Sequence, residues 1–132
     1  MSATIITGTV RKYYDEAKTQ LKEEYLKIDG KKEGNGMTYY PNTQLRSVGN
    51  YINDIKEGEY IKYYTTGQIE LKCLFINGKI EGEYKEYYHN GQIKFIGNYI
   101  NDNQEGEFHA YRENGSLRCT YFYVEGIEQS NP

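Results

Sequence analysis

The side chains that could carry chemistry in this sequence are two cysteines, two histidines and several glutamates. His89 and His109 have no cysteine or second histidine at the spacing of a zinc site. No G-x-S-x-G motif and no P-loop glycine run occurs, so neither a nucleophilic serine nor a phosphate cradle is indicated. We therefore expect no catalytic site, no metal site, no cofactor and no enzymatic activity.

Glutamate pairs recur in the tripeptide Glu-Gly-Glu, a pattern that a track of cation ligands could also produce. Successive pairs would lie two strands apart in a sheet, about 10 Å, whereas oxygen ligands approach a cation to roughly 2.6 Å. Adjacent pairs therefore cannot share an ion, and we expect a solvated or lysine-paired edge. The pairs are Glu57/Glu59, Glu81/Glu83 and Glu105/Glu107.

These glutamates belong to a longer phrase that returns at a fixed spacing. EGEYIKYYTTGQI begins at Glu57 and returns as EGEYKEYYHNGQI at Glu81, 24 residues later. A fixed period of this length predicts a repeat architecture. We expect a single domain over residues 1–132, with residues 127–132 as a flexible tail. The five units start near Gly8, Gly34, Gly58, Gly82 and Gly106.

Three positions are filled alike in all five units. Each position should therefore form a ladder of similar side chains along the stacked repeats. The ladders are Tyr13, Tyr39, Tyr63, Tyr87 and Tyr111; Leu21, Leu45, Ile69, Ile93 and Leu117; and Ile28, Ile52, Ile76, Ile100 and Val124.

Each unit reads as one β-hairpin. Asn90-Gly91, like Thr66-Gly67 and Asn114-Gly115, lies between two runs rich in tyrosine and isoleucine, which predicts a two-residue type I′ turn. This turn would pair Tyr64 with Ile69, Lys62 with Leu71, Tyr60 with Cys73 and Gly58 with Phe75, all on one face. A four-residue turn at Asn77-Gly78 would then place Phe75 beside Gly82 as well, with the ring over the bare glycine backbone on both sides.

Repeated hairpins with short turns predict an all-β fold. We expect an elongated single-layer antiparallel meander of about ten strands, open and twisted, in which each unit contacts its neighbours. The face with the glycine and aromatic positions should be the drier one. Cys73 and Cys119 would lie four strands apart, roughly 19 Å, too far for a disulfide, so both should be free thiols.

The stretch EGEYKEYYHNGQIKFIGNYINDNQEGE, from Glu81 to Glu107, resembles the MORN repeat in its variant form G-x-Y-x-x-Y-Y-x-N-G-x-I/L. The resemblance extends from about Gly8 to Gly126. It implies a twisted antiparallel sheet that serves as a scaffolding, dimerisation or protein-binding module. Phosphoinositide or membrane binding has also been proposed for this family, and some members are described as antitoxin partners.

The terminal units depart from the family pattern. The first lacks the Asn-Gly pair, the second has Asn42-Thr43, and the last has Arg112 in place of the second tyrosine. Degenerate ends are expected of capping units. They also leave an open strand edge at each terminus, which can pair with another chain.

Charge argues against nucleic acid and makes membrane binding unlikely. The net charge is −3, and lysines alternate with glutamates instead of forming the basic cluster that anionic lipids or RNA require. The sequence shows no signal peptide and no apolar stretch of transmembrane length. We expect a cytoplasmic location, in the host cytoplasm if the source is viral.

The aromatic face is the candidate partner site, because a sheet without a second layer leaves its rings partly exposed. The alternative is that these rings only form the core of the sheet. We expect a protein-interaction or scaffolding module, including a homodimer through the terminal edges or the aromatic face; the alternatives are a peripheral phospholipid-binding module and an antitoxin or immunity protein. The candidate residues are Tyr60, Tyr64, Phe75, Tyr84, Tyr88, Tyr99, Phe108 and Tyr123.

Overall fold

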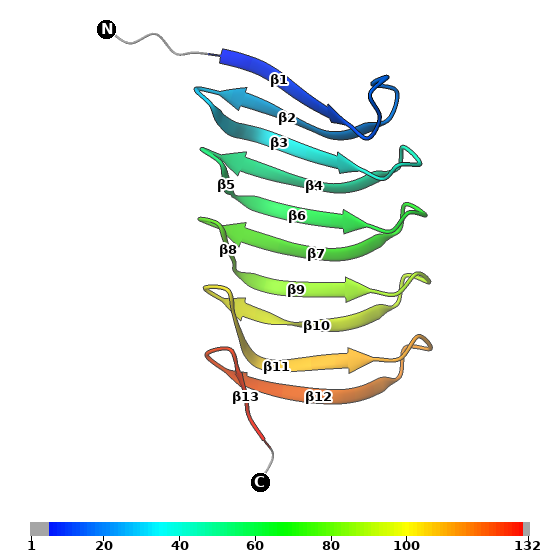
Figure 1. The fold of residues 1–132 in the computed structure, drawn as a ribbon. Helices are drawn as coiled ribbons and strands as arrows, with labels where there is room; N and C mark the ends of the chain where they lie inside the picture. The colour runs from blue at the N-terminus through cyan, green and yellow to red at the C-terminus, as the bar shows by residue number, and fades with distance from the viewer. Residues whose placement is uncertain (1–5, 131–132) are drawn as a thin grey trace, which may run out of the picture.

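The computed structural model describes residues 6–130, and these form a single β-sheet without a helix (Figure 1). No helix in this range could cross a membrane. The strands are β1 (Ile6–Tyr13), β2 (Leu21–Ile28), β3 (Lys31–Tyr39), β4 (Leu45–Ile52), β5 (Ile55–Lys56), β6 (Gly58–Tyr63), β7 (Ile69–Ile76), β8 (Lys79–Ile80), β9 (Gly82–Tyr87), β10 (Ile93–Ile100), β11 (Asn103–Tyr111), β12 (Leu117–Val124) and β13 (Ile127–Glu128).

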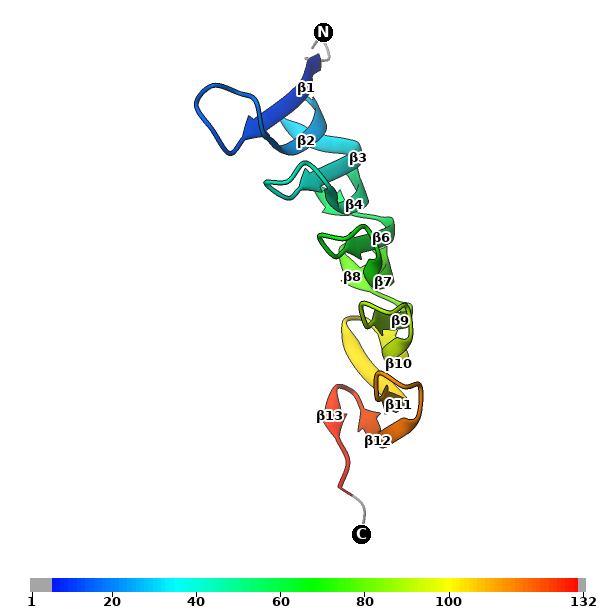
Figure 2. The ribbon, with the colours of Figure 1, turned by 90° about the vertical axis from the view of Figure 1, so that its right-hand side faces the viewer.

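The strands follow one another across the sheet in chain order, and every pair is antiparallel. The two-residue strands β5 and β8 pair with β4 and β7, and the other two-residue strand, β13, pairs with β12 where we expected the start of a flexible tail. Figures 1 and 2 show one open, twisted layer with the termini at opposite ends. The open meander of about ten full-length strands is therefore confirmed.

The hairpin loops of the second to fifth units have three residues, so the two-residue turn predicted there is wrong; the first unit has a five-residue loop. In the third unit, Tyr64 N donates to Gln68 O at 2.8 Å and Gly67 N donates to Tyr64 O at 2.9 Å. Only Gly67, with φ of 92°, has a left-handed backbone in this loop. This is the three-residue loop in which a turn is followed by a left-handed glycine.

Asparagine precedes that glycine because its side chain is an acceptor. Asn90 Oδ1 accepts from Gln92 N at 2.9 Å, and Asn114 Oδ1 accepts from Ser116 N at the same distance. The backbone of neither asparagine is left-handed. The Asn-Gly pair thus marks a hairpin correctly but for a different reason, an Asx-type hydrogen bond across the loop.

A β-bulge next to each loop restores the predicted register in the rest of the hairpin. Tyr63 pairs with Ile69 and Lys62 pairs with Leu71, which leaves Glu70 as the extra residue. The predicted pair of Tyr64 with Ile69 is therefore wrong, and Ile69 lies on the face opposite to the one expected. The pairs Lys62–Leu71, Tyr60–Cys73 and Gly58–Phe75 are confirmed. The bulge residues of the five units are Lys22, Arg46, Glu70, Lys94 and Arg118.

The type I′ turns lie between the units, where we expected four-residue turns. Asn77 and Gly78 have φ of 53° and 80°, and the flanking residues Ile76 and Lys79 pair directly. This is a two-residue type I′ turn, because both central residues have positive φ. Phe75 consequently pairs with Ile80 and not with Gly82.

The glycine that starts each unit is required by its backbone and not by an aromatic neighbour. Gly82 has φ of 81°, and a Cβ built on it would meet nothing within 4 Å. The expected ring over this glycine is therefore wrong. Rings do lie over other glycines, most closely at Gly97, where a Cβ would come within 2.2 Å of Phe108 Cδ1.

The hydrophobic core is small and, within residues 6–130, consists of four buried side chains. Phe108 is fully buried, and Tyr25, Cys73 and Ala110 are nearly so. Each belongs to a row that runs across the strands, so burial comes from side chains of adjacent strands and not from a second layer. Stability should therefore depend on close contacts such as the one between Phe108 and Gly97.

Replacing Gly97 by alanine should destabilise the fold, because the added methyl group overlaps the Phe108 ring. We expect a loss of about 1–3 kcal/mol in the free energy of unfolding, measured by urea denaturation. In a Phe108→Leu background the same substitution should cost less. An equal cost in both backgrounds would show that the ring contact is not the cause.

Candidate functional site

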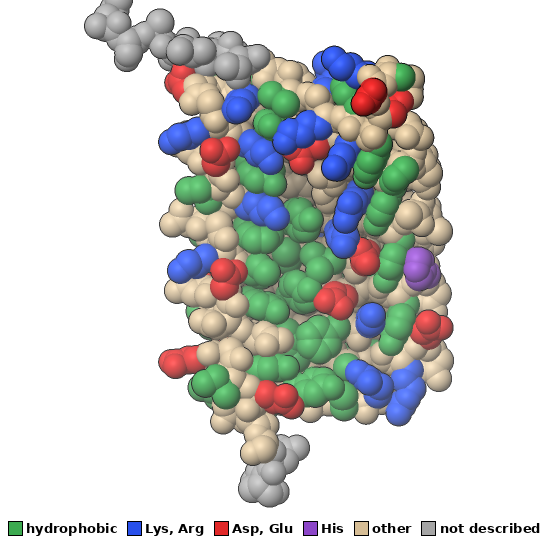
Figure 3. Space-filling view, viewed as in Figure 1, with side chains coloured by type: hydrophobic (Ala, Val, Ile, Leu, Met, Phe, Trp, Pro, Cys, Tyr) green, Lys and Arg blue, Asp and Glu red, His purple; other side chains and the backbone are tan. Residues whose placement is uncertain are grey.

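The front face, defined as the face that carries Tyr60 and Phe75, has a stripe of aromatic rings along the middle of the sheet (Figure 3). Tyr60 and Phe75 meet edge to face, with ring centroids 5.8 Å apart. Tyr84 and Tyr99 lie 5.1 Å apart in the next unit. The aromatic stripe comprises Tyr25, Tyr51, Tyr60, Phe75, Tyr84, Tyr99, Phe108 and Tyr123.

The aromatic stripe is tightest around Phe108. Its ring centroid lies 5.7 Å from that of Tyr99, 5.2 Å from that of Tyr123 and 5.2 Å from that of Phe95. Because these rings leave Phe108 with no exposed surface, it cannot touch a partner directly. Phe108 supports the stripe from below, while Tyr99 and Tyr123 stay partly exposed.

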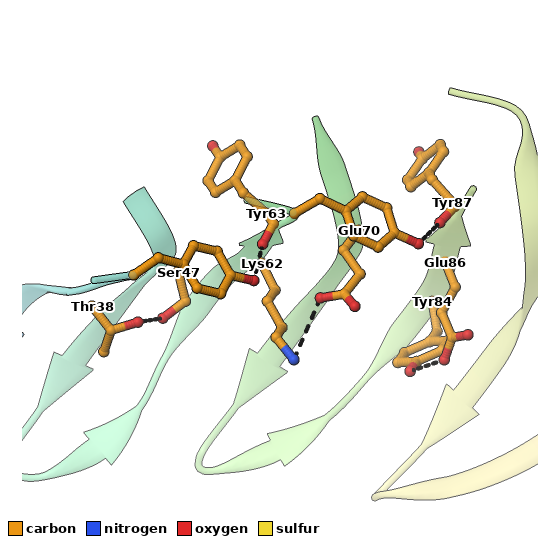
Figure 4. Close-up of polar contacts among 10 residues, drawn as sticks. Thr38, Ser47, Lys62, Tyr63, Glu70, Tyr84, Glu86 and Tyr87 are labelled. Carbon is orange, nitrogen blue, oxygen red and sulfur yellow. Dashed lines mark hydrogen bonds and ion pairs between the residues drawn. The ribbon is translucent and has the colours of Figure 1, made fainter. Parts of the chain in front are cut away.

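Burial also suppresses the ionisation of side chains on the front face. It raises the pKa of the Cys73 thiol to about 11, so the thiol is protonated and unreactive at neutral pH. Burial, together with a 2.7 Å hydrogen bond to Glu86 Oε1, raises the pKa of Tyr84 (Figure 4). Cys73 and Cys119 are both free thiols, as expected.

A second row of tyrosines, the tyrosine ladder, joins each unit to the next at the loop edge (Figure 4). The hydroxyl of Tyr64 donates to Tyr87 O at 2.5 Å, and the hydroxyl of Tyr88 donates to Tyr111 O at 2.7 Å. The remaining members make the same bond: Tyr14 with Tyr39 O at 2.7 Å, and Tyr40 with Tyr63 O at 2.6 Å.

The fifth unit has Arg112 at the position of the ladder tyrosine. The guanidinium instead donates to Leu117 O at 3.0 Å, within its own hairpin. The departure from the family pattern at this position therefore has a structural reason.

Glutamates perform the corresponding task at the opposite edge. Glu57 Oε2 accepts from Asn77 N in the following turn at 2.6 Å, and Glu81 Oε1 accepts from Asn101 N at 2.7 Å. Glu59 and Glu83, the second members of the pairs, contact lysines at 3.5 and 2.9 Å. The described residues contain no cluster of three potential metal ligands.

Cations lie over the rings of the front face, but only in some units. Lys56 Nζ is 4.4 Å from the ring centroid of Tyr60, and Arg46 Cζ is 5.5 Å from that of Tyr40. Lys22 lies over Tyr14 at 5.5 Å. In the third unit the equivalent of Arg46 is Glu70, and there His89 stacks on Tyr64 with ring centroids 3.7 Å apart.

Two hollows lie between the aromatic stripe and the tyrosine ladder. The first, of about 320 Å³, is formed by the first three units, and the second, of about 210 Å³, by the third and fourth. Lys22, Arg46 and Lys62 line the first, whereas Lys62, Lys94, Glu70 and Glu86 line the second. We call the part of the face between the aromatic stripe and the tyrosine ladder the groove. The groove is thus basic in the first three units and of mixed charge further along.

The back face carries the three ladders of similar residues that the sequence predicted. These are distinct from the tyrosine ladder, whose hydroxyls join the units. Tyr63 pairs with Ile69 there, and Ile76 follows Phe75 onto that side of β7. Ile52, Ile76 and Ile100 expose about half of their surface. Sequence reasoning found these ladders but placed the Ile69 row on the other face, because the bulge that moves it has no strong sequence signal.

Comparison with known families agrees with this geometry. The model of the MORN repeat variant matches residues 56–77 and 80–101, which cover most of the third and fourth units. Two of the five units therefore match the variant MORN repeat. MORN repeats are interaction modules for proteins and membranes, and an enzymatic role is not typical of them.

The other comparisons add little to the MORN match. One chain of the GtfA/B complex, solved with UDP and GlcNAc bound, is 11% identical, with a TM-score of 0.30. The similarity covers 75% of this chain and 19% of that one, so this protein spans about a fifth of its length. No curated protein matches the sequence.

The units place the eight candidate residues in three settings. Tyr60, Phe75, Tyr84, Tyr99 and Tyr123 form the accessible part of the aromatic stripe, and Phe108 lies beneath it. Tyr64 and Tyr88 belong to the tyrosine ladder, where their hydroxyls hold the next unit. Sequence reasoning did not single out the cationic row of Lys22 and Arg46, although their recurrence 24 residues apart was visible.

Replacing Tyr64 by phenylalanine should destabilise the stacked MORN units, because the substitution removes the bond to Tyr87 O. We expect a loss of about 0.5–1.5 kcal/mol in the free energy of unfolding, measured by urea denaturation. Tyr63→Phe is the matched control, since the Tyr63 hydroxyl bonds to nothing within residues 6–130. Equal losses in both variants would contradict a role for the hydroxyl.

Proposed function

We propose that this protein is a non-enzymatic module that binds another protein along its front face. The observation that carries this proposal is a continuous aromatic stripe with no second layer to cover it. Tyr60, Phe75 and Tyr84 all keep partly exposed rings along one line of the sheet. A long apolar strip with a polar border is typical of a protein-binding surface.

Variation among the units supports the front face, and not the back face, as the binding surface. The back-face ladders are alike in all five units, as expected for positions that each unit needs in order to stack. One front-face position instead changes along the chain, from Lys32 and Lys56 to Ile80, Gln104 and Glu128. A partner that lies along this face would therefore meet different side chains in each unit.

A charge placed at Ile80 should weaken partner binding without unfolding the sheet. Ile80 pairs with Phe75, and the equivalent position already holds Lys56 or Glu128 in other units. We expect Ile80→Glu to reduce the recovery of specific partners about tenfold in quantitative pull-downs from the native cell, with an unchanged melting temperature.

The matched control for Ile80→Glu is Leu74→Glu on the back face, where Leu74 is 41% exposed. This variant adds the same charge and should retain the partners. If Leu74→Glu loses the partners and Ile80→Glu keeps them, the binding surface is the back face and the proposal is wrong.

The outer edge of β12 favours self-association as a second candidate function. Gln129 N donates to Phe122 O, so the backbone of Phe122 points outward, as does that of Thr120 two residues earlier. The equivalent strand β7 is paired on this side by β9, through Lys72 and Lys85. In the described chain, nothing pairs with β12 at Thr120, which leaves a template for another strand.

Proline at Thr120 should disperse a dimer that forms through this edge. Thr120→Pro removes an outward N–H and leaves the backbone bonds to β11 intact, a substitution that edge strands tolerate. Thr120→Ala is the control, since it keeps the N–H. The contact of the Thr120 hydroxyl with His109 Nδ1, 3.0 Å, is lost in the proline variant and in the alanine control alike. We expect light scattering with size exclusion to give twice 15.5 kDa for the alanine variant and 15.5 kDa for the proline variant. Equal masses for the two variants would exclude β12 as the dimer edge.

A further inference from the structure

The first hollow of the front face has more cations than carboxylates in its lining. This basic hollow is lined by Tyr14, Lys22, Glu23, Thr38, Arg46, Ser47, Tyr60 and Lys62. Figure 3 shows lysine and arginine side chains gathered over the part of the face formed by the first units. Three cations thus line the hollow against one carboxylate.

Two of the three cations have no carboxylate partner within residues 6–130. Lys62 Nζ lies 3.4 Å from Glu70, and Glu23 contacts Lys12 and Lys32 at 3.6 and 3.8 Å. Lys22 and Arg46 contact only the rings of Tyr14 and Tyr40. Cations held over rings are oriented but keep their hydrogen-bond donors available for an anion.

The Thr38–Ser47 pair offers a further donor. Their hydroxyl oxygens are 2.5 Å apart, and Ser47 is only 8% exposed (Figure 4). The pair has two hydroxyl protons and uses one of them between its members. The second proton makes no hydrogen bond within residues 6–130, so it can be donated to a ligand or to Glu23 Oε1, which also lacks a hydrogen-bond partner on the strand position paired with Thr38.

One unit further along, the groove no longer has these free cations and this hydroxyl donor. Glu70 replaces Arg46, Leu71 replaces Ser47, and Glu86 replaces Lys62 at the equivalent positions. The second hollow consequently has two lysines against two glutamates. Of the two hollows, only the first, formed by the first three units, has an excess of cations over carboxylates.

The spacing of the two free cations suggests the conformation of the ligand. Lys22 and Arg46 are equivalent bulge residues two strands apart, a separation of about 9.6 Å across the sheet. A polyproline-II segment advances about 9.3 Å in three residues and brings every third side chain to the same side. An extended strand does not, because its residues three apart point to opposite sides.

We propose, building on the proposed function, that the partner contributes an acidic polyproline-II segment. The segment crosses the strands along the groove, with two acidic side chains three residues apart on Lys22 and Arg46. Its proline rings lie against the aromatic stripe, the surface that polyproline segments prefer. A bilayer fits this site less well, since the cations lie over rings at the wall of a hollow.

The probe is a fluorescein-labelled peptide, Pro-Pro-Glu-Pro-Pro-Glu-Pro-Pro, titrated with the full chain at low salt by fluorescence anisotropy. We expect it to bind at least about tenfold more tightly than the same peptide with glutamine for glutamate, with a difference that shrinks as salt rises. A peptide of equal composition with its glutamates two residues apart should also bind more weakly. Equal affinity of the glutamine peptide, or of the peptide with altered spacing, would overturn the proposal.

Charge reversal locates the site. Lys22→Glu/Arg46→Glu should lose at least about tenfold in affinity for the probe. Lys31→Glu/Lys79→Glu makes the same change of net charge on exposed back-face lysines that have no ion pair among the described residues, and it should keep the affinity. Melting curves of both variants show whether they are folded. Equal affinities of the two folded variants would overturn the proposal.

Anionic vesicles separate a membrane from a peptide. If phosphatidylserine vesicles pellet the protein, Lys22→Glu/Arg46→Glu abolishes pelleting and the probe does not bind, the hollow is a lipid site and this proposal is wrong. If Ile80→Glu loses its protein partners while the probe fails to bind the unaltered chain, the acidic segment is excluded and the proposed protein binding stands.

Discussion

A sheet of one layer has no opposite layer to pack on, and this constraint governs the rest of the structure. Each unit must gain its stability from the unit before and the unit after it. The chain meets this requirement at both edges. Tyrosine hydroxyls reach the next unit at the loop edge, and glutamates such as Glu57 reach the next turn at the other edge. The middle of the sheet is then held by rings that pack on each other and on glycine.

The same constraint explains why one chain can carry both stacking and recognition. Positions that join the units have little freedom, because a tyrosine that fails to reach its carbonyl weakens two units at once. Positions in the groove between the aromatic stripe and the tyrosine ladder make no such bond, so they can differ from unit to unit. Lys22, Arg46 and Glu70 occupy one such position. Binding preference can therefore change along a scaffold whose backbone stays the same.

The sequence predicted the period, the hairpins, the open antiparallel sheet and three of the four residue pairs within the hairpin, because these follow from spacing and alternation. It failed at the turns. Asn90-Gly91 is the strongest signal for a two-residue turn, yet Asn90 uses its side chain as an acceptor and the loop gains a residue. The bulge at Glu70 compensates for that residue, so two errors cancelled along most of the hairpin. Neither the bulge nor the resulting face of Ile69 could be read from residue types, since a charged residue in a strand is compatible with either arrangement.

The substitution at Arg112 has a consequence for how such a sheet acquires its length. Every earlier unit offers a phenol that reaches forward, whereas Arg112 bends back to Leu117 O and offers nothing to a sixth unit. The fifth unit therefore lacks the forward hydroxyl bond that joins the other units. A duplicated internal segment of 24 residues would bring its own forward tyrosine and be joined to its neighbours by the same bond, whereas a unit placed after Arg112 would not.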